Sequence, residues 1–247
     1  MTEGVGSDRR GPSVLAIQHV EPETTGLIGE VLAEGGARIT TVRVFEGETV
    51  PADFAPHDAL IVMGGPMGVY EADRHSHLAD EVELIRRAVQ NDVPVLGVCL
   101  GSQLLAAALG STVRPARKEL GWFPVTLTPE GAADPLFAGL PGTFAVLHWH
   151  GDAFDPPPGS SALASSVLTP CQAFRHGPHV GLLFHMEMSD AMIRALVEQD
   201  VASGYADAAI ARRVLDEMPR RLPAMHALAR TVFGRVSDTI AGKPLRA

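Results

Sequence analysis

The sequence predicts an α/β fold in which a mainly parallel sheet is flanked by helices, with a β-rich second half and a helical C-terminal appendage. Three observations support this prediction. Up to Gly110, short apolar runs alternate with segments whose apolar residues recur three and four positions apart. That rhythm is typical of βαβ units and a parallel sheet. After Gly110 short apolar stretches alternate with Pro/Gly turns. From about residue 203 the helical spacing returns.

The first half is expected to contain four strands, at residues 13–19, 38–45, 58–63 and 93–98. The last of these runs is apolar apart from Pro94 and Gly97, as expected for a buried parallel strand. The helices between and after the strands have apolar stripes at Leu27, Ile28, Val31 and Leu32, at Leu78, Val82, Ile85 and Val89, and at Leu104, Leu105, Ala108 and Leu109. Thr24 or Thr25 is the expected N-cap of the first helix.

The second half is expected to add strands at 112–114, 123–127, 144–148, 172–175 and 180–184 to the same domain. Ser189 or Asp190 should cap the next helix. Two further helices are expected after residue 203, the first ending at Pro219. We therefore expect a disordered lead-in at 1–12, a domain at 13–200 and a helical extension at 201–247. For the extension we expect packing or homo-oligomerisation rather than chemistry.

Charge and composition exclude several classes of function. The 247 residues carry a formal net charge of −9 and no dense Lys/Arg cluster, so no nucleic-acid surface is expected. No apolar run approaches membrane-spanning length, and the N-terminus lacks the apolar core of a signal peptide, so no membrane association is expected. The two cysteines, Cys99 and Cys171, fit free thiols better than a disulfide framework, which predicts a cytoplasmic protein.

The pattern Gly97-x-Cys99-x-Gly101 joins the 93–98 strand to a helix and has the spacing of a nucleophile elbow. Glycines are expected on both sides because side chains would collide with neighbours at such a turn. The helix N-terminus should also favour the thiolate form of Cys99. The alternative is an inert, buried cysteine, which is how we interpret Cys171 because no glycine elbow surrounds it.

A cysteine nucleophile needs a base, and the base needs an orienting group. His185 follows the 180–184 strand, and Glu187 comes two residues later. In an extended segment such residues face the same side, so Glu187 can hold the imidazole in one tautomer. The alternative interpretation of His185 and Glu187 is an exposed polar turn.

Taken together, these residues resemble the class I glutamine amidotransferase family, whose catalytic triad is Cys-His-Glu. The resemblance rests on Gly97-Val98-Cys99-Leu100-Gly101-Ser102-Gln103 and on Phe184-His185-Met186-Glu187. Met63-Gly64-Gly65-Pro66-Met67-Gly68 resembles the family's oxyanion loop, and Gln172-Ala173-Phe174-Arg175 resembles its penultimate strand. The similarity is good over roughly 58–190, and the subgroup it resembles is the stand-alone, GMP-synthase-like amidotransferase domains. It implies a flavodoxin-like arrangement of the sheet.

The resemblance also implies roles for individual residues. Cys99 would be the nucleophile, His185 the acid and base, and Glu187 the orienting group. Backbone N–H groups of Gly65 and Leu100 would form the oxyanion hole. Gln103 would bind the amino-acid head of the substrate. Segments 118–122 and 148–152 occupy substrate-side positions, so we take as further binding candidates Gly64, Glu119, His150, Gly151 and Asp152.

Some of these candidates have simpler interpretations. Asp152 has the alternative role of capping the turn at Gly151. His148 and His150 form a His-x-His pattern, which without nearby carboxylate or cysteine partners is a weak metal signal. We expect neither a metal nor a cofactor. One departure from the family is Met186, which stands where proline is usual between the histidine and the glutamate and leaves that turn less rigid.

Three functions are compatible with these features. The first is a glutaminase-type amidotransferase that releases ammonia from glutamine for a separate synthetase subunit, since no Gly-x-x-x-x-Gly-Lys-Ser/Thr loop for ATP is found in the sequence. The second is a stand-alone γ-glutamyl hydrolase or peptidase that acts on another γ-glutamyl amide. The third is a non-catalytic binding module of the same fold, against which the presence of Cys99, His185 and Glu187 argues.

Overall fold

The computed structural model describes residues 11–243, so most of the lead-in expected at 1–12 lies outside the described residues. Nine strands form one mixed sheet in the order β2-β1-β3-β4-β9-β8-β7-β5-β6. The strands are β1 (Ser13–Gln18), β2 (Arg38–Arg43), β3 (Ala59–Val62), β4 (Val95–Val98), β5 (Val113–Leu127), β6 (Thr143–Phe154), β7 (Ser161–Ser165), β8 (Ala173–His176) and β9 (His179–Leu182). The predicted α/β class with a flavodoxin-like sheet is confirmed.

The half of the sheet that contains β1, β2, β3, β4 and β9 is parallel. Strands β3, β4 and β9 are buried along their whole length, which explains why they are apolar on both faces. Because all five strands run the same way, the loops after β1, β3, β4 and β9 meet at one edge of the sheet. That edge receives the segments after Gln18, Val62, Val98 and Leu182.

The other half is antiparallel and forms the β-rich continuation that the sequence predicts. Its main feature is the long hairpin of β5 and β6, which are paired on both sides of a bulge between Pro115 and Glu119. The sequence suggested two short strands where β5 is one element. Pro115 and Pro124 interrupt the pattern, but only Thr126 and Leu127 of β5 pair with β7. A missing N–H therefore costs little along the rest of that side.

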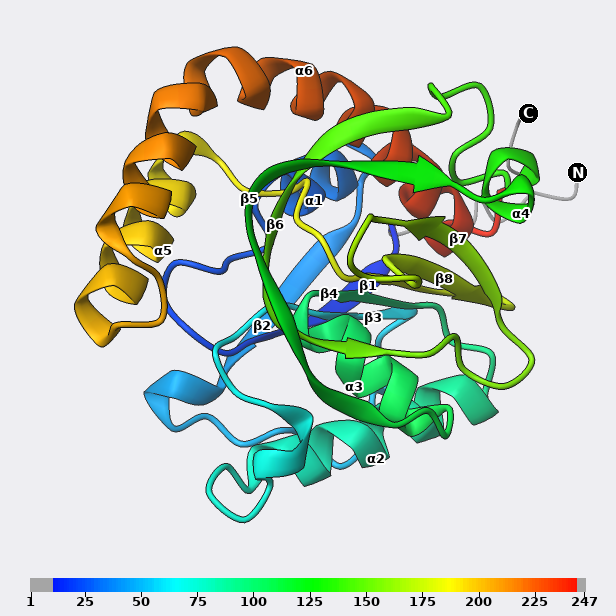
Figure 1. Ribbon diagram of the computed structural model, residues 1–247. Helices are drawn as coiled ribbons and strands as arrows, with labels where there is room; N and C mark the ends of the chain where they lie inside the picture. The colour runs from blue at the N-terminus through cyan, green and yellow to red at the C-terminus, as the bar shows by residue number, and fades with distance from the viewer. Residues whose placement is uncertain (1–10, 244–247) are drawn as a thin grey trace, which may run out of the picture.

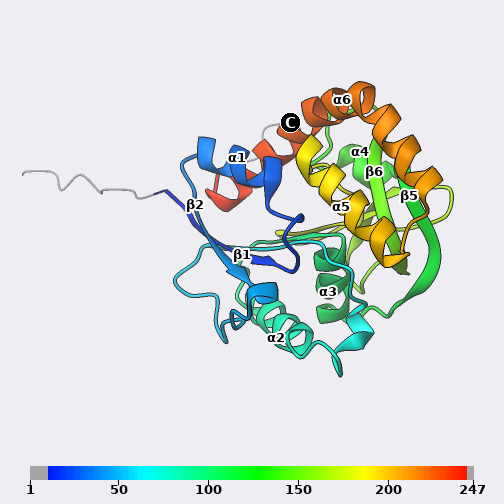
Figure 2. The same cartoon turned by 90° about the vertical axis from the view of Figure 1, so that its left-hand side faces the viewer.

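Helices cover both faces of the sheet (Figures 1 and 2). The helices are α1 (Gly26–Glu34), α2 (His77–Gln90), α3 (Leu100–Ala108), α4 (Pro129–Ala133), α5 (Asp190–Ser203) and α6 (Ala208–Ile240). Figure 2 shows α2 and α3 on one side of the sheet and α1, α5 and α6 on the other. The hydrophobic residues accordingly separate into two buried clusters, one on each side. Ser189 caps α5 through its side chain, as predicted.

The C-terminal segment is one helix, α6, and the prediction that Pro219 ends a first helix is wrong. Proline inside a helix costs about 3 kcal/mol because it removes a hydrogen bond and clashes with the preceding turn. Burial on both sides of the proline offsets this cost, since Val214 and Phe233 are fully buried. The indole N–H of Trp122 in β5 also donates to the Val214 carbonyl at 3.0 Å. Helix α6 thus arches over the α1 side of the sheet (Figure 1).

Within residues 11–243, none of the helices combines the length and the apolar character needed to cross a bilayer.

Candidate active site

Cys99 lies at the sharp turn between β4 and α3, with φ of 49° and ψ of −110°. This left-handed conformation is strained for a residue with a side chain. The two flanking glycines are required by close packing of the backbone. A Cβ on Gly97 would collide with the backbone of Gly101, and a Cβ on Gly101 would collide with the carbonyl oxygen of Val62. The local geometry is that of a nucleophile elbow.

The loop after β9 brings the buried side chains of His185 and Glu187 together. Nδ1 of His185 lies 2.7 Å from Oε1 of Glu187. The backbone of His185 is fixed by a bridge to Leu147, whose carbonyl accepts from the His185 N–H at 2.8 Å. The N–H of Met186 donates to Oε2 of Glu187 at 3.0 Å. A proline at this position could not make that bond, so Met186 adds a restraint on the carboxylate.

The charges of Cys99, His185 and Glu187 are coupled. Burial lowers the pKa of His185, but Glu187 and the neighbouring Cys99 sulfur raise it well above its ordinary value. Burial raises the pKa of the Cys99 thiol, and His185 opposes this only in part. The net direction for Cys99 is therefore opposite to the lowering expected from the helix N-terminus. A thiolate at this position depends on a protonated His185 beside it.

The two expected oxyanion donors, Gly65 and Leu100, flank the cysteine. Within the described part of the chain, their backbone N–H groups have no protein acceptor. Neighbouring N–H groups are engaged: Cys99 donates to Leu182 at 2.8 Å, and Gly101 donates to Met63 at 3.1 Å. The N–H groups of Gly65 and Leu100 therefore remain available for a ligand.

A cavity of about 310 Å³ opens beside Cys99. Four of the expected substrate-binding residues line it: Gln103, His150, Gly151 and Asp152. The buried Gln103 has an amide oxygen without a hydrogen-bond partner. Gly64 is not among the lining residues, and its carbonyl instead accepts from His19 at 3.0 Å.

Glu119, the remaining candidate, lies outside this cavity in a buried hydrogen-bond network. Its carboxylate accepts from the hydroxyls of Ser166 and Thr169 at 2.7 and 2.6 Å, and from the amide of Gln172 at 2.8 Å. These bonds join β5 to the loop before β8. They place Glu119 in the support of the pocket wall that carries His150, which contacts Gln172 at 3.3 Å.

Several lining residues were not identified from the sequence. Glu23, in the loop after β1, is buried beside His185 and has an unpartnered carboxyl oxygen. Burial raises the pKa of Glu23 to about 7. Asp200 of α5 accepts from the indole N–H of Trp149 at 2.7 Å. The only available signal for Glu23 was that polar residues directly follow a parallel strand, where sites gather.

The cavity also receives Tyr205, from the segment to which we assigned no chemistry. Its carbonyl accepts from Nζ of Lys118 at 2.7 Å, and its ring lies under the same ammonium group. The charged side chains around the cavity are the carboxyl groups of Glu23, Glu71, Asp152 and Asp200 and the single ammonium group of Lys118.

Two groups of side chains have metal-ligand chemistry: Glu119 with His148 and His150, and Glu81 with His19 and His77. In the first, the Glu119 oxygens already accept three hydrogen bonds. Burial also lowers the pKa of His148 to about 3 and that of His150 to about 4, which keeps both imidazoles neutral. In the second, both imidazoles contact the Glu81 carboxylate. We assign no metal to either group.

Comparison with known proteins places this geometry in a family. The family model described as glutamine amidotransferase class-I matches residues 22–195. The chain is 33% identical over 187 residues to the glutamine amidotransferase-like protein YfeJ of Salmonella typhimurium, covering 74% of this chain and 78% of that protein. It is 40% identical over 141 residues to the glutamine-hydrolysing GMP synthase of Thermomicrobium roseum, covering 56% of this chain but only 25% of the synthase.

A solved structure agrees over almost the whole chain. A glutamine amidotransferase from Thermotoga maritima superposes with a TM-score of 0.81 and 29% identity, covering 92% of this chain and 98% of the other. The elbow at Cys99 and the segment ending at Glu187 both fall within the range that the family model matches. The chain belongs to the class I glutamine amidotransferase family.

Proposed function

We propose that the protein hydrolyses the side-chain amide of glutamine through a thioester on Cys99 and releases ammonia. The observation that carries this proposal is the hydrogen-bonded pair of His185 and Glu187 next to a cysteine on a strained elbow at a cavity. The family supports amide hydrolysis of this kind in general terms.

In the first half of the reaction, the Cys99 thiolate attacks the side-chain carbonyl carbon of glutamine. An S–C bond forms, and the electron pair of the C=O bond moves to oxygen. The N–H groups of Gly65 and Leu100 stabilise this oxyanion. Protonated His185 gives its proton to the amide nitrogen, the C–N bond breaks and ammonia leaves.

In the second half, neutral His185 takes a proton from water, and the resulting hydroxide attacks the thioester carbon. The C–S bond breaks, glutamate leaves, and Cys99 is again a thiolate beside a protonated His185. Glu187 stabilises the imidazolium at both stages through the 2.7 Å bond to Nδ1. This agrees with the raised pKa of His185, in which the attraction of Glu187 outweighs the lowering by burial.

Substrate recognition would use the polar groups of the cavity. The unpartnered amide oxygen of Gln103 is a free acceptor for the substrate's α-ammonium group. Asp152 lines the cavity nearby and adds negative charge for the same group. Lys118 is the one ammonium group available for the α-carboxylate.

A second candidate function is hydrolysis of a γ-glutamyl amide whose leaving group is itself a cation. The specific observation in its favour is the excess of negative charge around the cavity, where four carboxyl groups face one ammonium group. A substrate with an additional positive charge would be favoured electrostatically in such a pocket. The same cysteine chemistry serves both substrates.

For the ammonia released from glutamine we propose an acceptor enzyme on a separate polypeptide. Support comes from the comparison with the Thermomicrobium roseum GMP synthase, of which this chain spans about a quarter. The partner would then carry the part of the reaction that consumes ammonia.

The function is tested by measuring glutamate and ammonia release from purified protein supplied with glutamine. Turnover that disappears in Cys99→Ala but persists in Cys171→Ala is the expected result. Cys171 is a suitable control because it is also buried but donates to its own chain at Ala173 and does not line the cavity. Absence of turnover with glutamine and with every γ-glutamyl amide, alone or with cell extract, would contradict the proposal.

A further inference from the structure

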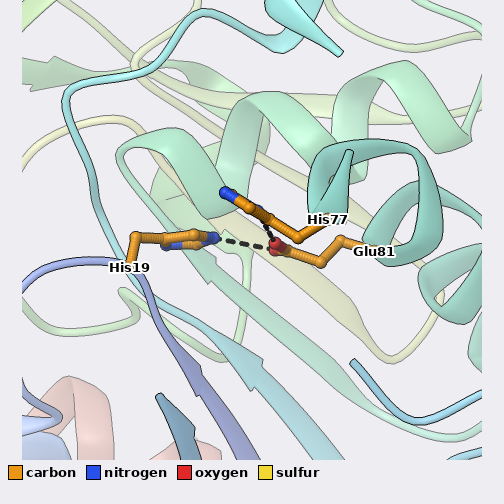
Figure 3. Close-up of side chains that lie close together, drawn as sticks. All are labelled: His19, His77 and Glu81. Atoms are coloured by element: carbon orange, nitrogen blue, oxygen red, sulfur yellow. Dashed lines mark hydrogen bonds and ion pairs between the residues drawn. The ribbon is translucent and has the colours of Figure 1, made fainter. Parts of the chain in front are cut away.

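A second buried polar cluster lies directly behind the oxyanion loop, and the mechanism above does not use it. It consists of His19, in the loop after β1, and His77 and Glu81, one turn apart at the start of α2 (Figure 3). Nε2 of His19 is 2.8 Å from Oε2 of Glu81. Nδ1 of His77 is 2.9 Å from Oε1 of the same carboxylate. His19 and Glu81 are buried, whereas His77 is partly exposed.

Proton bookkeeping fixes the charge of His19. Its Nδ1 is 3.0 Å from the carbonyl oxygen of Gly64, which can only accept, so Nδ1 must carry a hydrogen. Its Nε2 faces the Glu81 carboxylate, which is also an acceptor when ionised. Both bonds exist together only if both ring nitrogens are protonated. His77 needs no added proton, because a neutral imidazole with its hydrogen on Nδ1 can donate to Oε1.

The pKa directions agree with this assignment. Burial lowers the pKa of His19, but the attraction and hydrogen bond of Glu81, the bond to Gly64 and the charge of Glu23 together raise it above its ordinary value. Burial raises the pKa of Glu81, but His19 and His77 more than reverse this and lower it. A buried carboxylate without such partners would be strongly destabilising.

The bond from His19 determines where an oxyanion donor points. The carbonyl of Gly64 and the N–H of Gly65 belong to one peptide unit, and this peptide bond is trans. In a trans peptide the C=O and N–H vectors are antiparallel. A donor that holds the Gly64 oxygen on the His19 side therefore holds the Gly65 hydrogen on the opposite side. Gly65 lines the cavity beside Cys99, and its N–H has no other acceptor in the described chain.

We propose that His19 is a positioning residue that, as an imidazolium held by Glu81, orients and polarises the Gly64–Gly65 peptide so that the Gly65 N–H stabilises the oxyanion. A charged donor on the carbonyl strengthens the N–H at the other end of the peptide, because hydrogen bonds in a chain polarise one another. Glycine is needed at Gly65 because a Cβ would meet the Cβ of His19 at 2.8 Å. The inference rests on the proposed amide hydrolysis, since it assigns the geometry of that oxyanion hole.

Two matched substitutions separate the two bonds of His19. The amide nitrogen of asparagine is two bonds from Cβ, as Nδ1 is, so His19→Asn retains a donor for Gly64. The amide nitrogen of glutamine is three bonds from Cβ, as Nε2 is, so His19→Gln retains the contact with Glu81 and loses the Gly64 donor. We expect His19→Gln to lower kcat on the order of 100-fold, the usual effect of losing an oxyanion donor, with KM little changed. His19→Asn should retain most of kcat.

A second readout does not require turnover. An aldehyde analogue of glutamine adds the Cys99 thiol across its C=O bond, so that the former carbonyl oxygen occupies the oxyanion hole. We expect His19→Gln to weaken binding of this aldehyde by the same factor as it lowers kcat, while binding of glutamate stays unchanged. A defect limited to folding would lower both affinities together. Equal aldehyde affinity in the asparagine and glutamine variants would overturn the assignment of His19.

The charge on His19 is tested by ¹⁵N NMR of its ring. Near neutral pH both nitrogens should be protonated in the wild type, and Glu81→Gln should return His19 to a neutral ring. A neutral His19 in the wild type, or a bound zinc ion whose removal by a chelator changes activity, would overturn the proposal. Failure of the proposed function looks different: the wild type would hydrolyse no γ-glutamyl amide, while the NMR and aldehyde measurements would still report on His19.

Discussion

The two cysteines of the chain lie in environments that separate their reactivity. Cys99 lines the cavity next to His185, which can draw its proton away. Cys171 does not line the cavity, and burial raises its pKa to about 12. Thiolate is the nucleophilic form, so we expect a chloroketone analogue of glutamine to alkylate Cys99 far faster than Cys171. Peptide mapping after brief exposure checks this, and predominant modification of Cys171 would contradict the assignment of the nucleophile.

Glu187 acts on the reaction only through His185. Glu187→Gln retains the size of the side chain but can no longer stabilise the imidazolium, and its amide can favour the wrong tautomer. By comparison with other triads we expect kcat to fall on the order of 10⁴-fold. Cys99→Ala and His185→Ala should each abolish turnover, because nucleophile and base act as a unit. Steady-state kinetics with thermal unfolding as a fold control measures this, and near-normal turnover in Glu187→Gln would exclude the triad.

Glu23 links the site to the stability of the fold. Burial raises its pKa to about 7, against an ordinary value of 4.5, so the folded chain retains a proton there that the unfolded chain loses. Its contribution to stability is therefore complete below about pH 4.5 and is lost as pH rises through about 7. Glu23→Gln removes this titration. Relative to the wild type, we expect the variant to be more stable by a few kcal/mol near pH 8 than near pH 4, since one pKa unit corresponds to about 1.4 kcal/mol.

Urea unfolding of both proteins at the two pH values measures that difference. Other groups titrate in the same way in both chains, so they cancel in the comparison. A gap between variant and wild type that is independent of pH would show that Glu23 does not titrate abnormally.

At the scale of elements, the elbow and α6 respond oppositely to the same substitution. Gly101→Ala would drive a Cβ into the Val62 carbonyl, so it should destabilise the protein by several kcal/mol and disable Cys99. Gly234 lies inside α6 with nothing near its missing Cβ. Gly234→Ala should therefore stabilise the protein by roughly 0.5–1 kcal/mol through helix propensity and leave activity unchanged. Denaturant midpoints measure both, and a tolerated Gly101→Ala would contradict the tight packing of the elbow.

The sequence predicted well those elements whose signal is local. Helices α2 and α3 and strands β3 and β4 lie within a few residues of their expected positions, because each carries its own apolar pattern and turn signals. The two elements predicted as fragments, β5 and α6, are interrupted by prolines whose cost depends on the neighbours. In β5 the affected side has few partners, and in α6 burial offsets the loss. Neither fact is contained in the local sequence.

The whole molecule determines which residues meet at the cavity. Cys99, His185 and Glu187 could be proposed from the sequence because each lies in a short motif at the end of a strand. Glu23, Asp200 and Tyr205 come singly from three different segments, and only the packing of α5 and α6 against the sheet brings the last two to the cavity. Their side chains carry no motif, so spacing alone gave no signal for them.

The charge of the assembled cavity leads to a prediction about the substrate of the whole protein. Glutamine needs an acceptor for its ammonium group and a donor for its carboxylate, and Gln103 and Lys118 line the cavity. If ammonia is passed to a partner, the rate with glutamine alone should be low and should rise when the partner is added, because the partner must bind the competent state more tightly. We expect glutamine to remain the preferred substrate over a γ-glutamyl diamine and over a γ-glutamyl alkylamine of equal length.

Steady-state kinetics with these three substrates decides between the two functions, because the diamine and alkylamine differ only in the terminal charge. A value of kcat/KM at least 100-fold higher for the diamine than for glutamine would overturn the choice of glutamine. That ratio corresponds to about 2.7 kcal/mol of transition-state binding, which is more than incidental contacts supply. If the diamine also exceeds the neutral alkylamine, the carboxyl groups of the cavity select the cation. If the two amines are equal, size rather than charge accounts for the preference.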